Sequence, residues 1–145
     1  MDYANNRSAN QYGIIEKFEA GIELFGYEVK SIKAGRANIS TGYVKPRNNS
    51  LFLINAAIPP YQTKNTPQNY NPERSRRLLL TKSEIKKILG KLNEKGLTVI
   101  PIRFYNKNTK IKVEIGIARG LKKYDVREKI KRKEFERIKQ RTLKR

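Results

Sequence analysis

Residues 111–117 follow a strict two-residue repeat, which constrains the fold of this chain more than any other segment. The apolar positions are Ile111, Val113, Ile115 and Ile117, and Lys112, Glu114 and Gly116 stand between them. Successive side chains of a β-strand point to opposite faces, so this repeat predicts a strand with one face buried and one face in water. The strand therefore requires further strands beside it and an apolar core beneath it.

Other β-rich segments are separated by residues that favour turns. Tyr12–Glu19 is expected to form a first strand, and 97–105 forms a strand joined to 111–117 by a turn at 106–110. Residues 41–47 and 51–57 flank Asn48-Asn49-Ser50, so they predict a second hairpin.

Two segments carry helical periodicity. From Ile22 to Gly35, apolar residues recur every three or four positions, which predicts a short amphipathic helix despite Gly26. Thr81 and Glu84 form a capping box before a second apolar series, so a helix is expected from there to Gly96.

Strands that come in hairpins, with helices between them, favour an antiparallel arrangement over a doubly wound parallel sheet. We therefore predict a mainly β fold, an OB-like antiparallel β-barrel over 1–118 with two to three flanking helices and a basic C-terminal tail. Residues 59–77 are rich in Pro, Asn and Thr and predict a long irregular connection, of a kind that is usually functional or disordered.

The tail, residues 119–145, holds thirteen basic and four acidic residues with thinly spread apolar groups. It lacks a stripe that would pack on the domain, so we expect it to be disordered when free and helical when bound to RNA. A coiled-coil dimer is the main alternative, but sustained heptads are missing, and a monomer is expected.

The net charge of the whole chain is +20, from 33 Lys and Arg against 13 Asp and Glu. Compaction of such a chain works against strong self-repulsion, and a polyanion is the partner that would relieve it. The charge and its clustering predict binding to nucleic acid.

Catalysis is not expected. The chain has no Cys and no His, which removes the usual zinc ligand sets, thiolate nucleophiles and imidazole bases. The carboxylates form no acid–base motif, and the glycines form neither a phosphate loop nor a dinucleotide fingerprint. No cofactor, metal site or membrane contact is predicted, and the lack of an apolar signal segment predicts a cytoplasmic protein.

Several motifs together resemble the SmpB family of tmRNA-binding proteins, in matching order and spacing from about Asn5 onward. They are Phe18-Glu19-Ala20-Gly21; Glu28-Val29-Lys30-Ser31 with Ala34-Gly35-Arg36-Ala37-Asn38; Asn71-Pro72-Glu73-Arg74-Ser75-Arg76 before Leu78-Leu79-Leu80; and Ala118-Arg119-Gly120 before Tyr124-Asp125.

The resemblance implies a non-enzymatic OB-like protein that binds the tRNA-like domain of tmRNA (SsrA). It implies delivery with elongation factor Tu to stalled ribosomes, where trans-translation tags incomplete proteins. The tail is then expected to occupy the decoding centre and the empty mRNA channel, where it would contact chiefly small-subunit rRNA.

The residues implied for tmRNA binding are Asn5, Glu19 and Leu79, and basic residues near them are expected to hold phosphates: Arg7, Lys30, Lys33, Arg36, Arg74 and Arg76. The ribosome-binding residues expected in the tail are Arg119, Gly120, Lys122, Lys123, Tyr124, Asp125, Arg127 and Lys129. Leu121 and Val126 each stand where the family usually has Lys.

Two other classes of function stay open at this point. A generic OB-like ribosomal or translation-factor protein that binds structured rRNA would share the charge and the barrel, but it would not need the tail for activity. An RNA-modifying enzyme is the third class, which the absence of His, Cys and a cofactor motif disfavours.

Overall fold

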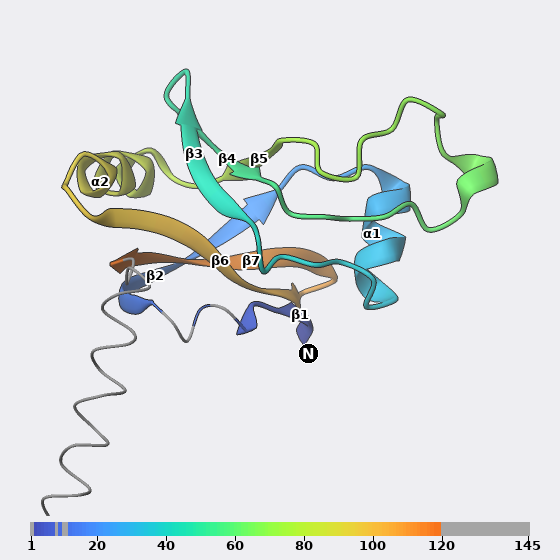
Figure 1. Cartoon of the computed structure of the whole chain (residues 1–145), viewed down its shortest axis with the longest axis horizontal. Helices are drawn as coiled ribbons and strands as arrows, with labels where there is room; N and C mark the ends of the chain where they lie inside the picture. The colour runs from blue at the N-terminus through green and yellow to red at the C-terminus, as the bar shows by residue number, and fades with distance from the viewer. Residues whose placement is uncertain (1, 8, 10–11, 120–145) are drawn as a thin grey trace, which may run out of the picture.

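The computed structural model of the chain describes residues 2–7, 9 and 12–119 (Figure 1). That part of the chain forms seven strands and two α-helices. The strands are β1 (Asp2–Asn5), β2 (Gly13–Ile22), β3 (Tyr43–Arg47), β4 (Ser50–Ile54), β5 (Arg76–Leu79), β6 (Leu97–Lys107) and β7 (Lys110–Arg119). The helices are α1 (Gly26–Lys33) and α2 (Lys82–Leu92), with a short 3-10 helix at Thr63–Asn65.

All strands belong to one antiparallel sheet with the order β1-β6-β7-β2-β5-β4-β3. The β3 strand, at one end of this order, also lies close to β6, so the bent sheet wraps around one core (Figure 1). The predicted class, mainly β and OB-like with flanking helices, is confirmed. The hydrogen-bonded order has two ends, so the barrel is not fully closed.

The core lies on the inner side of the sheet, and the two-residue repeat of 111–117 supplies much of it. Ile115 and Ile117 are fully buried, as are Phe104 on β6, Ile32 on α1 and Ile88 on α2. Both helices therefore cover the core with their apolar sides, as their periodicity predicted.

Both hairpins close with two residues of positive φ. The φ angles are 50° and 61° at Asn48 and Asn49, and 49° and 69° at Asn108 and Thr109. Two successive residues of positive φ are the backbone conformation of the two-residue hairpin turn whose twist matches that of the flanking antiparallel strands. The predicted hairpins are confirmed.

Four element boundaries differ from the sequence expectations. The polar N-terminus contains β1, which pairs with β6, and Ile22 ends β2 instead of starting α1. Strand β5 begins at Arg76, inside the segment 59–77 that was expected to be irregular, and α2 ends at Leu92, four residues before Gly96. At β1, at Ile22 and at β5 the segment pairs with a distant strand, and this pairing outweighs the local pattern.

The connection between β4 and β5 is irregular, as predicted, but a buried ionic cluster fixes its ends. Glu28 of α1 is fully buried and accepts hydrogen bonds from Arg76 Nε (2.8 Å), Arg74 Nε (3.0 Å) and the Tyr70 hydroxyl (2.9 Å). Arg76 also donates to the carbonyls of Ala56 and Pro72, each at 2.8 Å. We call Glu28, Tyr70, Arg74 and Arg76 the Glu28 cluster.

Candidate nucleic-acid interface

The side of the sheet opposite the core presents polar side chains on five neighbouring strands. Directly paired residues of antiparallel strands lie on the same face, so the register assigns each of them. We define this outer face by Asn5, Lys17, Glu19, Gly21, Leu79, Arg103, Tyr105, Lys107, Lys110, Lys112 and Glu114.

The three residues implied for tmRNA binding all lie on the outer face. Asn5 pairs with Arg103, Glu19 pairs with Glu114, and Gly21 pairs with Leu79. Asn5 and Glu19 are exposed, and 48% of the Leu79 surface is accessible although Leu79 is a large apolar residue. Residues 74 positions apart in the chain are thus brought onto one surface by strand pairing.

Asn6 fixes the chain directly after β1. Its amide Nδ2 donates to the Pro101 carbonyl at 2.8 Å, and its backbone N–H donates to the Ile102 carbonyl at 2.8 Å. This buried anchor leaves Asn5 on the outer face and Arg7 exposed two residues beyond β1.

Glu19 is held as an ionised acceptor. The Tyr105 hydroxyl donates a short hydrogen bond to its carboxylate, and Lys107 Nζ lies 3.0 Å from Oε1. The bond from Tyr105, followed by the bond from Lys107, lowers the pKa of Glu19 below its usual range. Burial and the bond to Glu19 raise the pKa of Tyr105. Near neutral pH, Glu19 is therefore ionised and the Tyr105 hydroxyl keeps its proton.

Charge is distributed unevenly along the outer face. At one end Arg103 pairs with Asp2 (2.5 Å) and with Glu114 (3.4 Å), while its guanidinium carbon lies 4.2 Å from the centre of the Tyr105 ring. At the other end neither Lys110 nor Lys112 has a hydrogen bond or ion pair with any described residue. The second end can therefore accept phosphates without first losing an internal ion pair.

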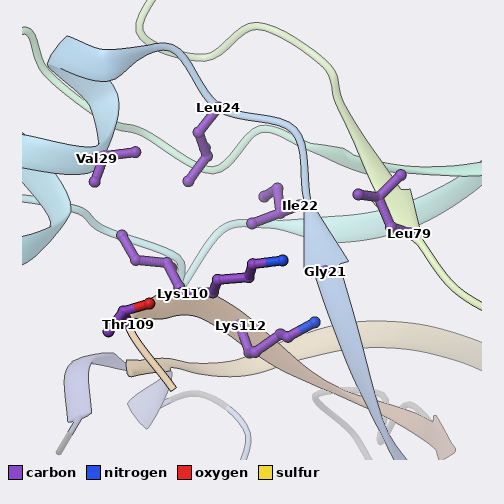
Figure 2. A pocket seen from close by; sticks show the side chains of 9 residues that line it. Gly21, Ile22, Leu24, Val29, Leu79, Thr109, Lys110 and Lys112 are labelled. Carbon is purple, nitrogen blue, oxygen red and sulfur yellow. The ribbon is translucent and has the colours of Figure 1, made fainter. Parts of the chain in front are cut away.

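A hollow of about 310 Å³ opens at that second end (Figure 2). The lysine side chains extend toward Gly21, and Leu79 stands on the far side of that strand (Figure 2). The remaining lining residues are Ile22, Leu24, Val29, Thr109 and Ile111. A hollow with an apolar wall and two amines has the chemistry to hold an unpaired base and its phosphate.

Gly21 keeps this hollow open. A Cβ at this position would lie 3.1 Å from Leu79 Cβ and 3.6 Å from Lys112 Nζ. The first distance is tighter than ordinary van der Waals contact, so a side chain here would displace Leu79 and fill the mouth of the hollow.

Lys30, Lys33 and Arg36 gather elsewhere, at α1 and the segment just after it, and all three are exposed. Arg36 donates from Nη1 to the Tyr61 carbonyl at 3.1 Å, and its guanidinium carbon lies 5.4 Å from the centre of the Tyr61 ring. We call Lys30, Lys33, Arg36 and Tyr61 the α1 basic patch.

The expectation that Arg76 contacts RNA is corrected by the structure. Its side chain is 0% exposed, and its guanidinium is bonded throughout to the Glu28 cluster and to backbone carbonyls. Arg74 is only partly exposed and pairs with Glu28. Its guanidinium carbon lies 4.2 Å from the centre of the Phe25 ring. These two arginines therefore hold the end of the loop in place before β5.

Arg119, expected at the start of the tail, is the exposed last residue of β7 and pairs with Gly13 and Leu97. The other expected tail residues, from Gly120 to Lys129, lie outside the described residues.

Five residues of the outer face were not predicted from the sequence: Arg103, Tyr105, Lys107, Lys110 and Lys112. Of these, Lys112 was visible as a polar position of the alternating strand 111–117, whereas Lys107 and Lys110 fell in the expected turn.

The described residues offer neither a metal-ligand group nor a membrane-spanning helix. No group of three or more His, Cys, Asp and Glu side chains there could hold a metal ion. Neither α1 nor α2 has the length and apolar character that crossing a bilayer requires.

Comparison with known proteins gives one consistent family. The profile of the family described as SmpB protein matches residues 3–145. The SsrA-binding protein of Trichodesmium erythraeum is 49% identical over 142 residues, covering 97% of this chain and 91% of the relative. That of Gloeothece citriformis is 48% identical with 97% and 92% coverage, and that of Nitrosomonas europaea is 48% identical with 96% and 92%.

A solved structure described as "tmRNA-SmpB: a journey to the center of the bacterial ribosome" matches with a TM-score of 0.68. It is 41% identical and covers 82% of this chain and 84% of its own. With the profile match spanning nearly every residue and relatives close to half identical, the chain belongs to the SmpB family.

Proposed function

We propose that this protein binds the tRNA-like domain of tmRNA through its outer face and delivers it to stalled ribosomes for trans-translation. The observation that carries the proposal is the convergence of Asn5, Glu19 and Leu79 on one exposed face. This face ends in Lys110 and Lys112, neither of which forms an ion pair within the described part of the chain. Membership in the SmpB family supports the same RNA, because the relatives are named for binding SsrA.

Different residues of the outer face make different kinds of contact with RNA. Lys110 and Lys112 supply charge for phosphates, which gives affinity without sequence preference. Glu19 accepts hydrogen bonds from base amines or a 2′-hydroxyl, and the fixed carboxylate restricts which RNA surfaces fit. The exposed Leu79 side chain adds apolar contact with an unstacked base or a ribose.

The protein acts in this proposal as a non-enzymatic adaptor in the cytoplasm. Elongation factor Tu joins through the tmRNA complex, and the tail, 119–145, fills the decoding centre and the empty mRNA channel. The thirteen basic residues of the tail support this role, because a vacant channel lined by RNA attracts a polycation. Occupancy by a messenger RNA would exclude the tail, so only stalled ribosomes would be selected.

The test is binding of the full-length protein to a tmRNA tRNA-like domain and to unstructured RNA of equal length, at one near-physiological salt concentration. Non-specific binding of a basic protein has a Kd of about 10⁻⁴–10⁻⁶ M under such conditions. We expect the tRNA-like domain to bind orders of magnitude more tightly. Equal affinity for both RNAs would leave a generic RNA binder, which is the rRNA-binding alternative.

A further inference from the structure

Tyr105 belongs to the outer face but is almost closed to solvent. Only 8% of its surface is accessible, compared with 37% for Tyr43 on β3. The guanidinium of Arg103 lies over the Tyr105 ring, with its carbon 4.2 Å from the ring centre. An unpaired base needs an open ring face on which to stack, so this geometry does not favour direct stacking of RNA on Tyr105.

The hydroxyl of Tyr105 instead reaches across a whole strand. Tyr105 pairs with Lys112 and Glu19 pairs with Glu114, so β7 lies between the two residues. The Tyr105 hydroxyl spans this strand and donates a short hydrogen bond to Glu19 Oε2. The bond therefore joins β6 to β2, two strands that do not pair with each other in the sheet.

The Tyr105 ring is itself held in place from both neighbouring strands. Arg103, which covers the ring, pairs with Asp2 of β1 at 2.5 Å and with Glu114 of β7 at 3.4 Å. A series of contacts thus runs across the outer face from Asp2 through Arg103 and Tyr105 to Glu19. A side chain whose own rotamer is fixed by packing holds its partner more precisely than a mobile one does.

Lys107, the second partner of Glu19, does not supply the same precision. Its Nζ lies 3.0 Å from Oε1 and 3.2 Å from Oε2, and its side chain is 53% exposed. An ammonium group is a compact charge on a flexible stem, so it can follow the carboxylate as the carboxylate rotates. Of the two partners, Tyr105 is the one that fixes the plane of the carboxylate.

The carboxylate of Glu19 keeps room for a further donor. It has about four lone-pair sites, and Tyr105 and Lys107 use at most three of them. A base amine or a 2′-hydroxyl can donate to the remaining site only if it stands at the right place. Unstructured RNA holds no donor at a set position relative to its phosphates, whereas a folded RNA does.

We propose that Tyr105 is a positioning residue that sets RNA specificity, because it orients Glu19 toward a donor group of the folded RNA without contacting the RNA itself. The inference rests on the proposed function, in which Glu19 meets the tRNA-like domain of tmRNA. It adds to the recognition site a residue that acts only through another side chain.

The test is a double-mutant cycle in the full-length protein. The four members are the wild type, Tyr105→Phe, Glu19→Ala and the double variant. Tyr105→Phe removes only the hydroxyl and keeps the ring under Arg103, and Tyr43→Phe removes a hydroxyl from an exposed ring as its control. Each protein is titrated with the tRNA-like domain and with unstructured RNA of equal length at several salt concentrations, and urea unfolding verifies that each is folded.

We expect Tyr105→Phe to weaken binding of the tRNA-like domain by about 3- to 10-fold, less than the loss of a whole hydrogen bond to a charged group. The slope of log K against log salt should stay unchanged, because no phosphate contact is lost. Binding of unstructured RNA should also stay unchanged, and Tyr43→Phe should behave as the wild type.

The decisive comparison is made in the Glu19→Ala background. There, the further change Tyr105→Phe should alter the affinity for the tRNA-like domain by less than about twofold, because a residue that acts through Glu19 has nothing left to orient. A general loosening of the sheet would instead weaken the binding of both RNAs and would persist without Glu19.

Three outcomes overturn the inference. Wild-type affinity of Tyr105→Phe would show that Lys107 alone holds Glu19. Additive losses in the double variant would show that Tyr105 acts independently of Glu19, and equal losses for both RNAs would show an effect unrelated to specificity. Failure of the proposed function looks different, because there the wild-type protein itself would not distinguish the tRNA-like domain from unstructured RNA.

Discussion

At the scale of single residues, Glu19 illustrates how a carboxylate can serve a surface that binds a polyanion. Its charge is already compensated by Lys107, and the Tyr105 hydroxyl fixes its orientation. The lowered pKa keeps it ionised, so it is an acceptor and not a donor at neutral pH. An RNA group that donates to Glu19 is favoured, and a phosphate at the same position is not.

Glu19→Gln should therefore weaken binding to the tRNA-like domain by about tenfold, the value of one hydrogen bond to a charged group. Removal of a negative charge alone would strengthen binding to RNA, so the direction of the change is diagnostic. The matched control is Glu16→Gln on the same strand, where the side chain lies on the opposite face and pairs with Lys87 at 2.6 Å. Filter-binding or fluorescence titrations check both; equal affinities for the two variants would contradict a role for Glu19.

Lys112→Ala tests the phosphate end of the outer face. We expect weaker binding to the tRNA-like domain and a salt-dependence slope that is smaller by about 0.9, because one phosphate contact is lost. Lys95→Ala, an exposed lysine in the turn before β6, removes the same charge elsewhere and should leave the slope unchanged. If the slopes of the two variants fall equally, the effect is general charge and not a contact at Lys112.

At the scale of elements, the Glu28 cluster joins α1, β5 and the loop between β4 and β5. Burial alone would raise the pKa of Glu28, but hydrogen bonds from Arg74, the Phe25 backbone and Arg76 outweigh burial and lower it. Burial and the bond to Glu28 raise the pKa of Tyr70 to about 12. The cluster therefore holds the Glu28 carboxylate ionised beside a neutral Tyr70 phenol.

Glu28→Gln should lower the free energy of unfolding at pH 7 by about 3–5 kcal/mol, because the buried charge of Arg76 would lose its partner. Glu23→Gln is the control, since the pair of Glu23 with Arg77 is exposed and 3.9 Å long, and should change stability by less than about 1 kcal/mol. Urea unfolding of both variants measures the difference. A Glu28→Gln protein as stable as the control would contradict the structural role of the cluster.

The same cluster predicts a pH dependence. The folded pKa of Glu28 lies below the unfolded value of about 4.3, so its contribution is complete above the unfolded pKa and is lost as the pH falls through the folded pKa. Wild-type stability should therefore drop on acidification below about pH 4. The drop should be smaller in Glu28→Gln, which urea unfolding at pH 7, 5 and 3 would measure; parallel curves would argue against the linkage.

The turn between β6 and β7 carries a strained residue beside the proposed RNA site. Thr109 is β-branched and has a φ of 69°, a conformation that costs a non-glycine residue about 1–2 kcal/mol. Glycine relieves this strain but adds about 0.5–1 kcal/mol of chain entropy loss on folding. Thr109→Gly should stabilise the protein by about 0.5–1 kcal/mol, as thermal unfolding would show.

Asn108→Gly is the control in the same turn. Asparagine tolerates a positive φ, so glycine relieves little strain at its φ of 49° while it adds the same entropy cost. We expect Asn108→Gly to be neutral or slightly destabilising. A larger gain at Asn108 than at Thr109 would show that strain at the β-branched residue is not the cause.

At the scale of the whole molecule, positive charge is shared between two parts of the chain. Residues 119–145 hold thirteen of the 33 basic residues, and the barrel region holds the other twenty with nine acidic residues. The barrel is thus strongly basic by itself, and eight of its twenty cations lie on the outer face and the α1 basic patch. Binding of tmRNA and action on the ribosome should be separable by removal of the tail.

A protein that ends at Arg119, the last residue of β7, keeps every described strand and helix. We expect it to bind the tRNA-like domain with full specificity over unstructured RNA, because the outer face is intact. Tagging of incomplete proteins in a translation assay should be abolished, because the segment proposed for the mRNA channel is gone. Normal tagging by the truncated protein would contradict the role proposed for the tail in the mRNA channel.

The sequence by itself determined the periodic elements and the class of partner. The alternation of 111–117, the capping box at Thr81 and the asparagine turn at 48–49 act over a few residues, where local sterics and hydrogen bonds decide the conformation. Net charge is a property of composition, so a polyanionic partner could be predicted without a fold. The family motifs named Asn5, Glu19 and Leu79 but gave no reason for their proximity.

Only the tertiary structure decided which polar residues face outward together. Strand pairing placed Asn5, Glu19 and Leu79 on one face, because register is a long-range property that no local pattern fixes. Arg74 and Arg76 look alike in sequence to the exposed basic residues, yet the buried carboxylate of Glu28, 46 and 48 residues away, draws both into the protein. A buried ion pair requires its partner to be brought near by folding, so the sequence alone could not separate an arginine that binds RNA from one that holds a loop.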